Sequence, residues 1–339
     1  MENYLKSSIL GRGSYGTVYK VLSRTSEQIF ALKCTGVPDS NKGVEDSTVR
    51  ELSCLTALKG HPNVIQIHDC FIDNGQVAMV MDYVPYTLAQ IIHNGHGVKF
   101  YYDEFQCTPL IPESFIAHFS TQVANALSYM HGLNIIHRDL TPSNILVTED
   151  LVIQVADMGM SRHASRWMSP AVVTEPYRAP EVCKALAEKK ECTEYTCAID
   201  MWSLGVMIAD AFEGHMVFQA RKRDMTTYDL ILRSVEHENT DRISMDQRID
   251  LKDIIPNVMS SSLARNIVMS ILVFRETERL TAREFLRKTE WTQLASMTED
   301  DIQLVKKQIA RSVKWREEAQ EERDAERDLK CHETFEDSD

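Results

Sequence analysis

The chain has 339 residues, of which 43% are hydrophobic, so it can bury a sizeable core in two domains or in two lobes of one fold. Its formal net charge of −13 argues against direct binding to the phosphate backbone of nucleic acid. No run of 18 uncharged apolar residues occurs and residues 1–10 are too polar for a secretory signal, so we expect no membrane span and no export. The eight cysteines are scattered without the spacing of zinc ligands, which predicts free thiols in the nucleus or cytoplasm.

The first eighty residues are typical of short strands around one helix. Residues 47–58 have helical spacing, because Val49, Leu52 and Leu55 or Thr56 recur on one face before a Gly and a Pro. Alternating or β-branched apolar patterns bounded by Gly, Asn and Asp predict strands over residues 5–10, 17–23, 28–35, 65–72 and 76–83.

After residue 83 the pattern becomes helical. A helix begins over residues 88–93, and residues 94–112 contain Gly and Pro at intervals that predict an irregular insertion. Residues 114–130 form an amphipathic pattern, and residues 200–213 are nearly all apolar, which predicts a buried helix. Strands followed by helices indicate an α+β fold, with a small β-rich lobe over residues 1–82 and a larger helical lobe over residues 83–297.

Residues 298–339 are a highly charged tail, with 14 acidic and 8 basic residues. Ile302, Val305, Ile309 and Val313 form one apolar stripe, which predicts a helix that packs on the body and then a solvated, fraying end. The alternative is a helix that binds a partner.

Two neighbouring segments carry the most specific chemistry. His137 to Asn144 reads His-Arg-Asp-Leu-Thr-Pro-Ser-Asn, and Asp157-Met158-Gly159 follows thirteen residues after Asn144, beyond two short apolar strands at 145–147 and 152–155. Asp139 can accept and orient the proton of a hydroxyl nucleophile, and Asn144 and Asp157 can hold Mg²⁺ ions that bridge the phosphates of ATP. This pattern indicates transfer of a γ-phosphoryl group.

A glycine-rich segment, a lysine and a glutamate complete this set. Gly11, Gly13 and Gly16 lie between two predicted strands, where glycine lets the backbone approach phosphates. Such a motif alone also fits a plain hairpin, and a dinucleotide-binding fold would need a strand, a turn and a helix here. Lys33 follows the apolar run from Phe30 to Leu32 on the third predicted strand and can contact phosphates, and Glu51 is the helix carboxylate that could orient it.

Three arginines on separate segments, Arg50, Arg138 and Arg162, could converge on one anion. Guanidinium groups suit a phosphate, so Ser169, or with less support Ser165, is the candidate phosphorylated residue. The alternative is three unrelated surface arginines.

Two further pairings have structural roles. Asp200 at the start of the buried helix could accept hydrogen bonds from the backbone of the Asp139 loop, and Arg279 could pair with Glu181.

These motifs occur in order, so residues 4–291 resemble a eukaryotic protein kinase, and the closest likeness is to cyclin-dependent kinases. The likeness to that group lies in the segment from Glu45 to Glu51, which is similar to their cyclin-contacting helix, and in Arg178 with the valines before it. It implies a bilobal protein kinase fold and an ATP- and Mg²⁺-dependent serine/threonine kinase that acts before Pro, binds a cyclin and regulates the cell cycle or transcription. It also implies that Ser14 and Tyr15 are inhibitory phosphosites and that Thr174 bonds near Asp139. The implied nucleotide pocket consists of Val18, Ala31, Leu146, Met81 and the backbone of Asp82 and Val84.

The chain departs from the family at two places that bear on activity. Thr141 replaces the Lys of the catalytic loop, so a contact to the γ-phosphate is missing, and Pro176 replaces a Trp beside the substrate groove. One alternative is a mitogen-activated kinase, which the lack of a Thr-x-Tyr pair in residues 161–174 argues against. The other is a pseudokinase scaffold or a weakly active enzyme, which Thr141 and Pro176 favour.

Overall fold

The structure is a computed structural model that describes residues 2–13, 16–35, 44–93, 111–219, 225–235 and 250–336. The predicted phosphosites Ser14 and Tyr15, and residues 94–110 of the predicted insertion, lie outside the described residues.

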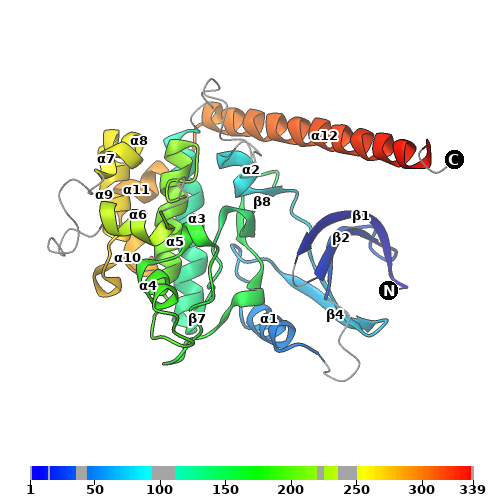
Figure 1. Cartoon of the computed structure of the whole chain (residues 1–339), viewed down its shortest axis with the longest axis horizontal. Helices are drawn as coiled ribbons and strands as arrows, with labels where there is room; N and C mark the ends of the chain where they lie inside the picture. The colour runs from blue at the N-terminus through cyan, green and yellow to red at the C-terminus, as the bar shows by residue number, and fades with distance from the viewer. Residues whose placement is uncertain are drawn as a thin grey trace.

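The N-terminal part is an antiparallel sheet of five strands in the order β1-β2-β3-β5-β4, with one helix beside it (Figure 1). One face of the sheet closes on its own small core, which includes Val21, Leu32 and Val80, because alternate side chains of a strand point to the same face. The elements of this part are β1 (Tyr4–Gly13), β2 (Gly16–Ser23), β3 (Ile29–Cys34), α1 (Asp46–Ala57), β4 (Ile67–Asp73) and β5 (Gln76–Asp82).

The larger part is mainly helical and follows the sheet in the chain (Figure 1). Its first elements are β6 (Tyr86–Thr87), α2 (Leu88–Ile92), α3 (Glu113–Gly132), β7 (Ile135–Ile136), β8 (Ile145–Val147), β9 (Ile153–Val155), β10 (Arg162–His163), α4 (Pro180–Ala187) and α5 (Ala198–Glu213). The remaining helices are α6 (Thr227–Ser234), α7 (Leu251–Ile254), α8 (Pro256–Ser260), α9 (Ser262–Ile271), α10 (Ala282–Phe285), α11 (Thr289–Leu294) and α12 (Glu299–Glu336).

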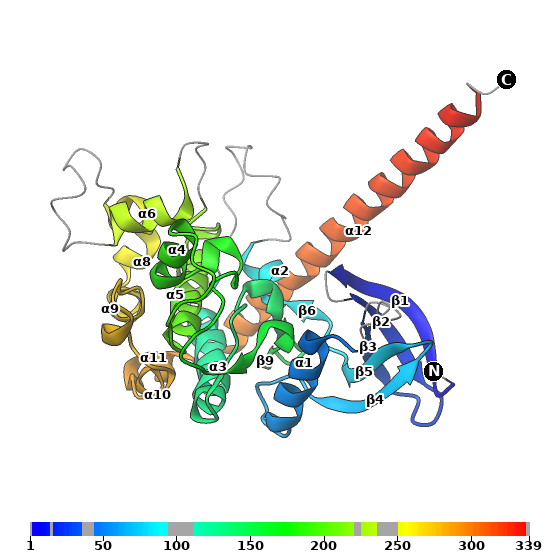
Figure 2. The same cartoon turned by 60° about the horizontal axis from the view of Figure 1, so that its bottom comes forward.

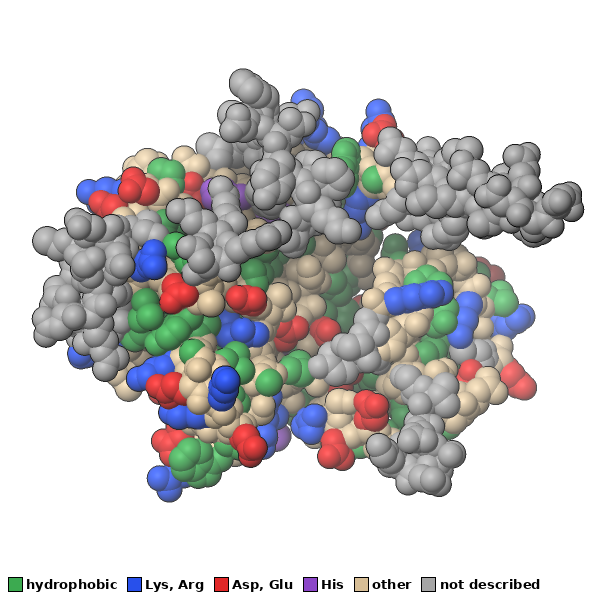
Figure 3. Space-filling view, in the orientation of Figure 1, with side chains coloured by type: hydrophobic (Ala, Val, Ile, Leu, Met, Phe, Trp, Pro, Cys, Tyr) green, Lys and Arg blue, Asp and Glu red, His purple; other side chains and the backbone are tan. Residues whose placement is uncertain are grey.

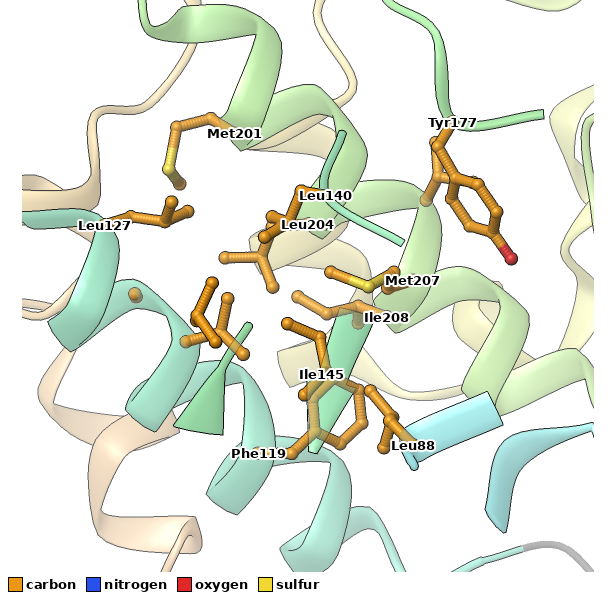
Figure 4. Packing of buried hydrophobic residues seen from close by; sticks show 14 of the residues in the cluster. Leu88, Phe119, Leu127, Leu140, Ile145, Tyr177, Met201, Leu204, Met207 and Ile208 are labelled. Carbon is orange, nitrogen blue, oxygen red and sulfur yellow. The ribbon is translucent and has the colours of Figure 1, made fainter. Parts of the chain in front are cut away.

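Helix α5 lies at the centre of the helical part, as its apolar sequence predicts. All its residues from Ile199 to Phe212 are buried. Leu140, within the Asp139–Asn144 loop, and Ile145, directly after it, are fully buried and point into the packing around Leu204 and Ile208 of this helix (Figure 4). The loop is therefore packed against a helix that is buried along nearly its whole length.

Helix α12 extends further along the chain than the sequence predicts. Val305 and Ile309 are buried against the body, as the apolar stripe predicts. However, the helix does not fray where the stripe ends, because it continues to Glu336 and projects away from the rest of the molecule (Figure 2). Glu, Arg and Lys are strong helix formers, and pairs such as Lys314–Glu318 at 3.7 Å support an exposed helix.

The expected α+β, bilobal architecture is confirmed. A small sheet with one helix precedes a larger helical part, and the predicted strands and helices occur within a few residues of their expected ends. The space-filling view shows a hollow between the two parts (Figure 3). No helix in the described part of the chain is long and apolar enough to cross a membrane.

Candidate active site

Lys33, Glu51 and Asp157 meet in the space between the sheet and the helical part. Lys33 Nζ lies 2.6 Å from Glu51 Oε1 and 3.1 Å from Asp157 Oδ1. Burial alone would lower the pKa of Lys33, but the two carboxylates raise it above its ordinary value, so the ammonium is firmly charged. Glu51 is buried rather than solvated, and it joins helix α1 to strand β3.

The loops that carry Asp139, Asn144 and Asp157 are hydrogen-bonded to each other, because the N–H of Ala156 donates to the carbonyl of Asn144 at 2.9 Å. Asn144 Nδ2 donates to the backbone carbonyl of Asp139 at 2.8 Å and to its Oδ2 at 3.2 Å. Asp157 has a left-handed backbone, with φ of 60°, and its Oδ1 accepts from the N–H of Gly159 at 3.4 Å. Burial would raise the pKa of the Asp157 carboxyl, but the Lys33 ammonium lowers it below its usual range.

Thr174, at the end of residues 161–174, is hydrogen-bonded to Asp139. Its backbone N–H and its hydroxyl both donate to Asp139 Oδ1, at 3.1 and 2.9 Å. This is the contact that the family resemblance implies. Thr141 is buried, and its carbonyl accepts from the N–H of Asn144 at 3.0 Å, so the loop closes without a cation at this position.

Asp200 holds the backbone of the catalytic loop, as its position predicts. Its carboxylate accepts from the N–H of His137 at 2.9 Å and of Arg138 at 3.0 Å. The ring of His131 donates to the same carboxylate at 2.9 Å. Burial would lower the pKa of His131, but Asp200 and Cys197 raise it to about 9, so the imidazole is charged. Because Arg138 has a positive φ of 70°, this strained loop needs such fixed partners.

The predicted pair of Arg279 and Glu181 is confirmed. Two nitrogens of Arg279 reach the two oxygens of Glu181 at 2.8 and 3.0 Å, a bidentate arrangement. The guanidinium also lies over the ring of Trp202 on α5, 5.2 Å from its centroid. This contact ties the start of α4 to the core of the helical part.

The glycine-rich segment is a hairpin in which β1 pairs with β2 and Gly13 lies opposite Gly16. This excludes the strand–turn–helix of a dinucleotide-binding fold. A Cβ on Gly16 would lie 2.0 Å from the carbonyl oxygen of Cys34, and its φ is +129°, so the fold itself requires glycine there. A Cβ on Gly11 would meet nothing within 4 Å, so the fold alone does not explain that glycine.

The residues expected around adenine lie on neighbouring strands. Ala31 of β3 is opposite Met81 of β5, and Val18 of β2 is opposite Lys33. Leu146 is half-buried on β8. Within the described residues, the N–H and C=O groups of Val84 make no hydrogen bond, and the N–H of Asp82 donates to the carbonyl of Gln66 at 3.1 Å.

Arg50 and Arg162 lie close enough to Arg138 for their charges to act on it. Burial lowers the pKa of Arg138, and the charges of Arg162 and Arg50 lower it further. The Nε of Arg138 is buried and has no hydrogen-bond partner among the described residues. The hydroxyl of Tyr195 donates to the backbone carbonyl of Ser169 at 2.9 Å, and the charges of Arg138 and Arg162 act on the same tyrosine. Ser169 therefore lies beside a concentration of positive charge.

Sequence reasoning missed His131 and Tyr195. His131 lies at the end of α3 and has no motif of its own, although its contact with Asp200 spans 69 positions. Tyr195 contacts Ser169 across 26 positions. In the sequence, only the helical pattern of α3 and the motif around Asp200 indicated that the segments of His131 and Asp200 lie close together.

Comparisons with known proteins agree with this geometry. The family described as "Protein kinase domain" matches residues 4–292. The chain is 28% identical over 301 residues to "Cell division control protein 2 homolog 3" of Trypanosoma brucei brucei, which covers 84% of this chain and 91% of that protein.

Two proteins of Encephalitozoon cuniculi are each 32% identical to the chain. The match to "Probable CTD kinase subunit alpha homolog" covers 68% of this chain and 63% of that protein. The match to "Cyclin-dependent kinase 1" covers 62% of this chain and 66% of that protein. The expected likeness to cyclin-dependent kinases is thus confirmed, and the chain belongs to the protein kinase domain family.

Proposed function

We propose that the chain is an ATP- and Mg²⁺-dependent protein serine/threonine kinase of the cyclin-dependent type. The observation that carries this proposal is the joint placement of Lys33 beside Glu51 and Asp157, and of Thr174 beside Asp139. The ion pair of Lys33 and Glu51 is one that phosphoryl transfer by kinases requires. The Thr174 contact fixes the Asp139 carboxylate.

The residues present fit a nucleotide and its metal. The backbone groups of Val84 have no partner in the described part of the chain, and a side chain on Gly11 would enter open space. Asn144 uses its amide nitrogen on Asp139, which leaves its oxygen as a cation ligand, and Asp157 is ionised. Asn144 and Asp157 would hold Mg²⁺, which would neutralise phosphate charge, and Lys33 would hold the phosphates. Oxygen ligands of this kind suit Mg²⁺.

In this proposal Asp139 positions the acceptor hydroxyl and accepts its proton. Its Oδ1 is held by Thr174 and its Oδ2 by Asn144, so the carboxylate has a fixed orientation. Fixed positioning lowers the entropy cost of the reaction, and a cationic Lys33 stabilises charge near the phosphates.

The loop before Arg178 supports a preference for Pro after the acceptor. Val173 has a φ of 65°, and its carbonyl accepts from Arg178 Nη2 at 2.9 Å. Arg178 Nε donates to the carbonyl of Val172 at 3.1 Å. Because the carbonyl of Val173 already accepts a hydrogen bond from Arg178, the backbone N–H of a substrate residue beside it would be left without an acceptor. Proline has no backbone N–H and therefore avoids this cost. Pro176 in the same loop would weaken this preference.

The arginine cluster supports control by phosphorylation. Arg138 has a buried Nε without a partner in the described residues, and the carbonyl of Ser169 is fixed beside the cluster by Tyr195. A phosphate on Ser169 would supply the missing acceptors and balance Arg50, Arg138 and Arg162.

Helix α1 supports binding of a cyclin. Its buried face carries Glu51, whereas Val49 is 55% exposed, and Val44 just before the helix is also exposed. An exposed apolar side chain on the helix that orients Lys33 is where a partner could fix that helix in place. The name of one relative, a cell division control protein homolog, supports a role in cell division. We propose transcription as the alternative role, and the nucleus or cytoplasm as the location.

The second candidate is a pseudokinase or weakly active scaffold, which the missing cation at Thr141 favours. Phosphorylation of matched peptides separates the two. Purified protein with candidate cyclins should phosphorylate a Ser-Pro peptide more rapidly than the same peptide with Ser-Ala. Binding of ATP without phosphorylation of either peptide would favour the scaffold, and equal rates would contradict the preference for Pro.

A further inference from the structure

Helix α12 lies beyond the kinase domain, since the family match ends at residue 292 and the helix begins at Glu299. Its start is fixed by two reciprocal hydrogen bonds. The N–H of Thr298 donates to Asp301 Oδ2 at 3.1 Å, and the N–H of Asp301 donates to Thr298 Oγ1 at 3.2 Å. Such a capping box satisfies N–H groups that the first turn of a helix leaves unpaired. The helix therefore has a defined start, although the proposed reaction gives it no role.

The buried face of α12 lies against α2 and α3. Within the described part of the helix, the buried side chains recur at positions i, i+3, i+4 and i+7, and so share one face: Val305, Gln308, Ile309 and Ser312. The helix packs against α2 and α3, and two views place its beginning beside α2 (Figure 1, Figure 2). The apolar side chains of Val305 and Ile309 are therefore buried at the junction with these two helices.

Helix α2 needs support from its neighbours because it is very short. It has five residues, Leu88–Ile92, and an isolated helix of that length is unstable in water. Its apolar side chains, Leu88, Ile91 and Ile92, are all buried in the same core as the apolar stripe of α12. The place of α2 is thus set by what packs on it, and α12 is one of those neighbours.

Helix α2 in turn contacts two parts of the proposed site. Thr87, directly before α2, is opposite Leu146 of β8, the residue expected under adenine. The helix also packs against β8 and against the turn Pro142–Asn144. Leu88 points toward Ile145, which directly follows that turn (Figure 4). A shift of α2 would therefore move both the floor of the nucleotide pocket and the turn that carries a proposed metal ligand.

We propose that α12 is a positioning element for nucleotide binding, in which Val305 and Ile309 hold α2 against β8 and the catalytic loop. This inference rests on the proposed kinase function and assigns the charged tail a part in binding ATP. Neither side chain touches the nucleotide, because both act through α2 on Leu146 and Asn144. A tail that only binds a partner would leave ATP binding unchanged when its buried face is altered.

The expected effect is a weaker affinity for ATP. Replacing Val305 and Ile309 by Ala removes buried methyl and methylene groups and leaves a cavity between α12 and its neighbours. If the pocket then keeps its binding arrangement for about a tenth of the time, the apparent Kd for ATP rises about tenfold. The conservative change Ile309→Val removes a single methylene and should retain most of the affinity.

The test uses the full chain with Mg²⁺ and ATP, and calorimetric titration gives the Kd directly. The main variant combines Val305→Ala with Ile309→Ala, and Ile309→Val is the conservative variant. Ile267→Ala is the matched control, because Ile267 is 4% exposed on α9, which packs against α5, α8 and α11. Urea denaturation shows whether each variant is folded, and Val305→Ala alone carries the test if the double variant is not.

Amide hydrogen exchange gives a second measurement that needs no nucleotide. Exchange over residues 86–92 and 144–147 should be faster in the double variant than in wild type, because α2 would be less firmly held. The same residues should exchange at the wild-type rate in Ile267→Ala.

A wild-type Kd for ATP in the folded double variant would overturn the inference. So would an equal rise of the Kd in Ile267→Ala, since ATP binding would then follow stability in general. If the wild type binds no ATP, the proposed kinase function fails, and the exchange measurement still decides whether α12 holds α2 in place.

Discussion

The contact between His131 and Asp200 predicts a specific pH dependence of stability. The pKa of His131 is raised from 6.5 to about 9, because the buried carboxylate of Asp200 holds the charged form. A rise of this size corresponds to about 3 kcal/mol of stability. That contribution is complete below pH 6.5 and is lost as the pH rises through 9.

The perturbation is His131→Gln, which keeps a donor for Asp200 but cannot titrate. The free energy of unfolding should be measured by urea denaturation of both proteins between pH 6 and pH 10. The wild type should be more stable than the variant at pH 6, by about 3 kcal/mol, and this advantage should nearly vanish at pH 10. His163→Gln, which changes an exposed histidine on β10, is the control and should show no such trend.

Asp200 also holds the N–H groups of His137 and Arg138, so the effect should reach the catalytic loop. Amide hydrogen exchange at these two positions should be faster in His131→Gln than in wild type at pH 7. A stability difference that stays constant from pH 6 to pH 10 would refute the reasoning.

Substitutions at three further positions test the site. Asp157→Asn should leave the fold intact and lower phosphoryl transfer by about a thousandfold or more in steady-state kinetics, and near-normal turnover would contradict the metal role. Ser169→Ala should lower activity with the cyclin bound, and Ser169→Glu should restore little because one carboxylate has fewer acceptors and less charge than a phosphate; full activity of Ser169→Ala would argue against the switch. Thr141→Lys should raise kcat by about tenfold to a hundredfold with little change in the KM for ATP, and an unchanged or lower kcat would show that the site has compensated.

Much of the site could be predicted because its residues occur in motifs with fixed spacing. Lys33 and Glu51 were expected to pair, and the structure brings them into contact and adds Asp157 to the pair. The sequence could also place Asp200 under the catalytic loop, because a carboxylate at the start of a buried helix needs hydrogen-bond donors.

The rest depended on distant contacts or on packing. His131 meets Asp200 only because α3 and α5 lie side by side, and no local pattern encodes that. From the sequence, Gly16 was predicted to let the backbone approach phosphates. The structure shows a further reason for glycine, because a carbonyl oxygen of β3 leaves no room for a side chain. The extent of α12 was underestimated, because a charged segment without an apolar stripe can be either a frayed end or an exposed helix.

A single-turnover assay with radiolabelled ATP tests the central claim most directly. Purified protein would be mixed with Mg²⁺, a candidate cyclin and a Ser-Pro peptide, with Asp139→Asn as the matched control. The account predicts transfer of label to the peptide by the wild type and a loss of at least about a hundredfold in Asp139→Asn. Tight binding of ATP by the wild type without any transfer of label, or equal transfer by both proteins, would contradict it.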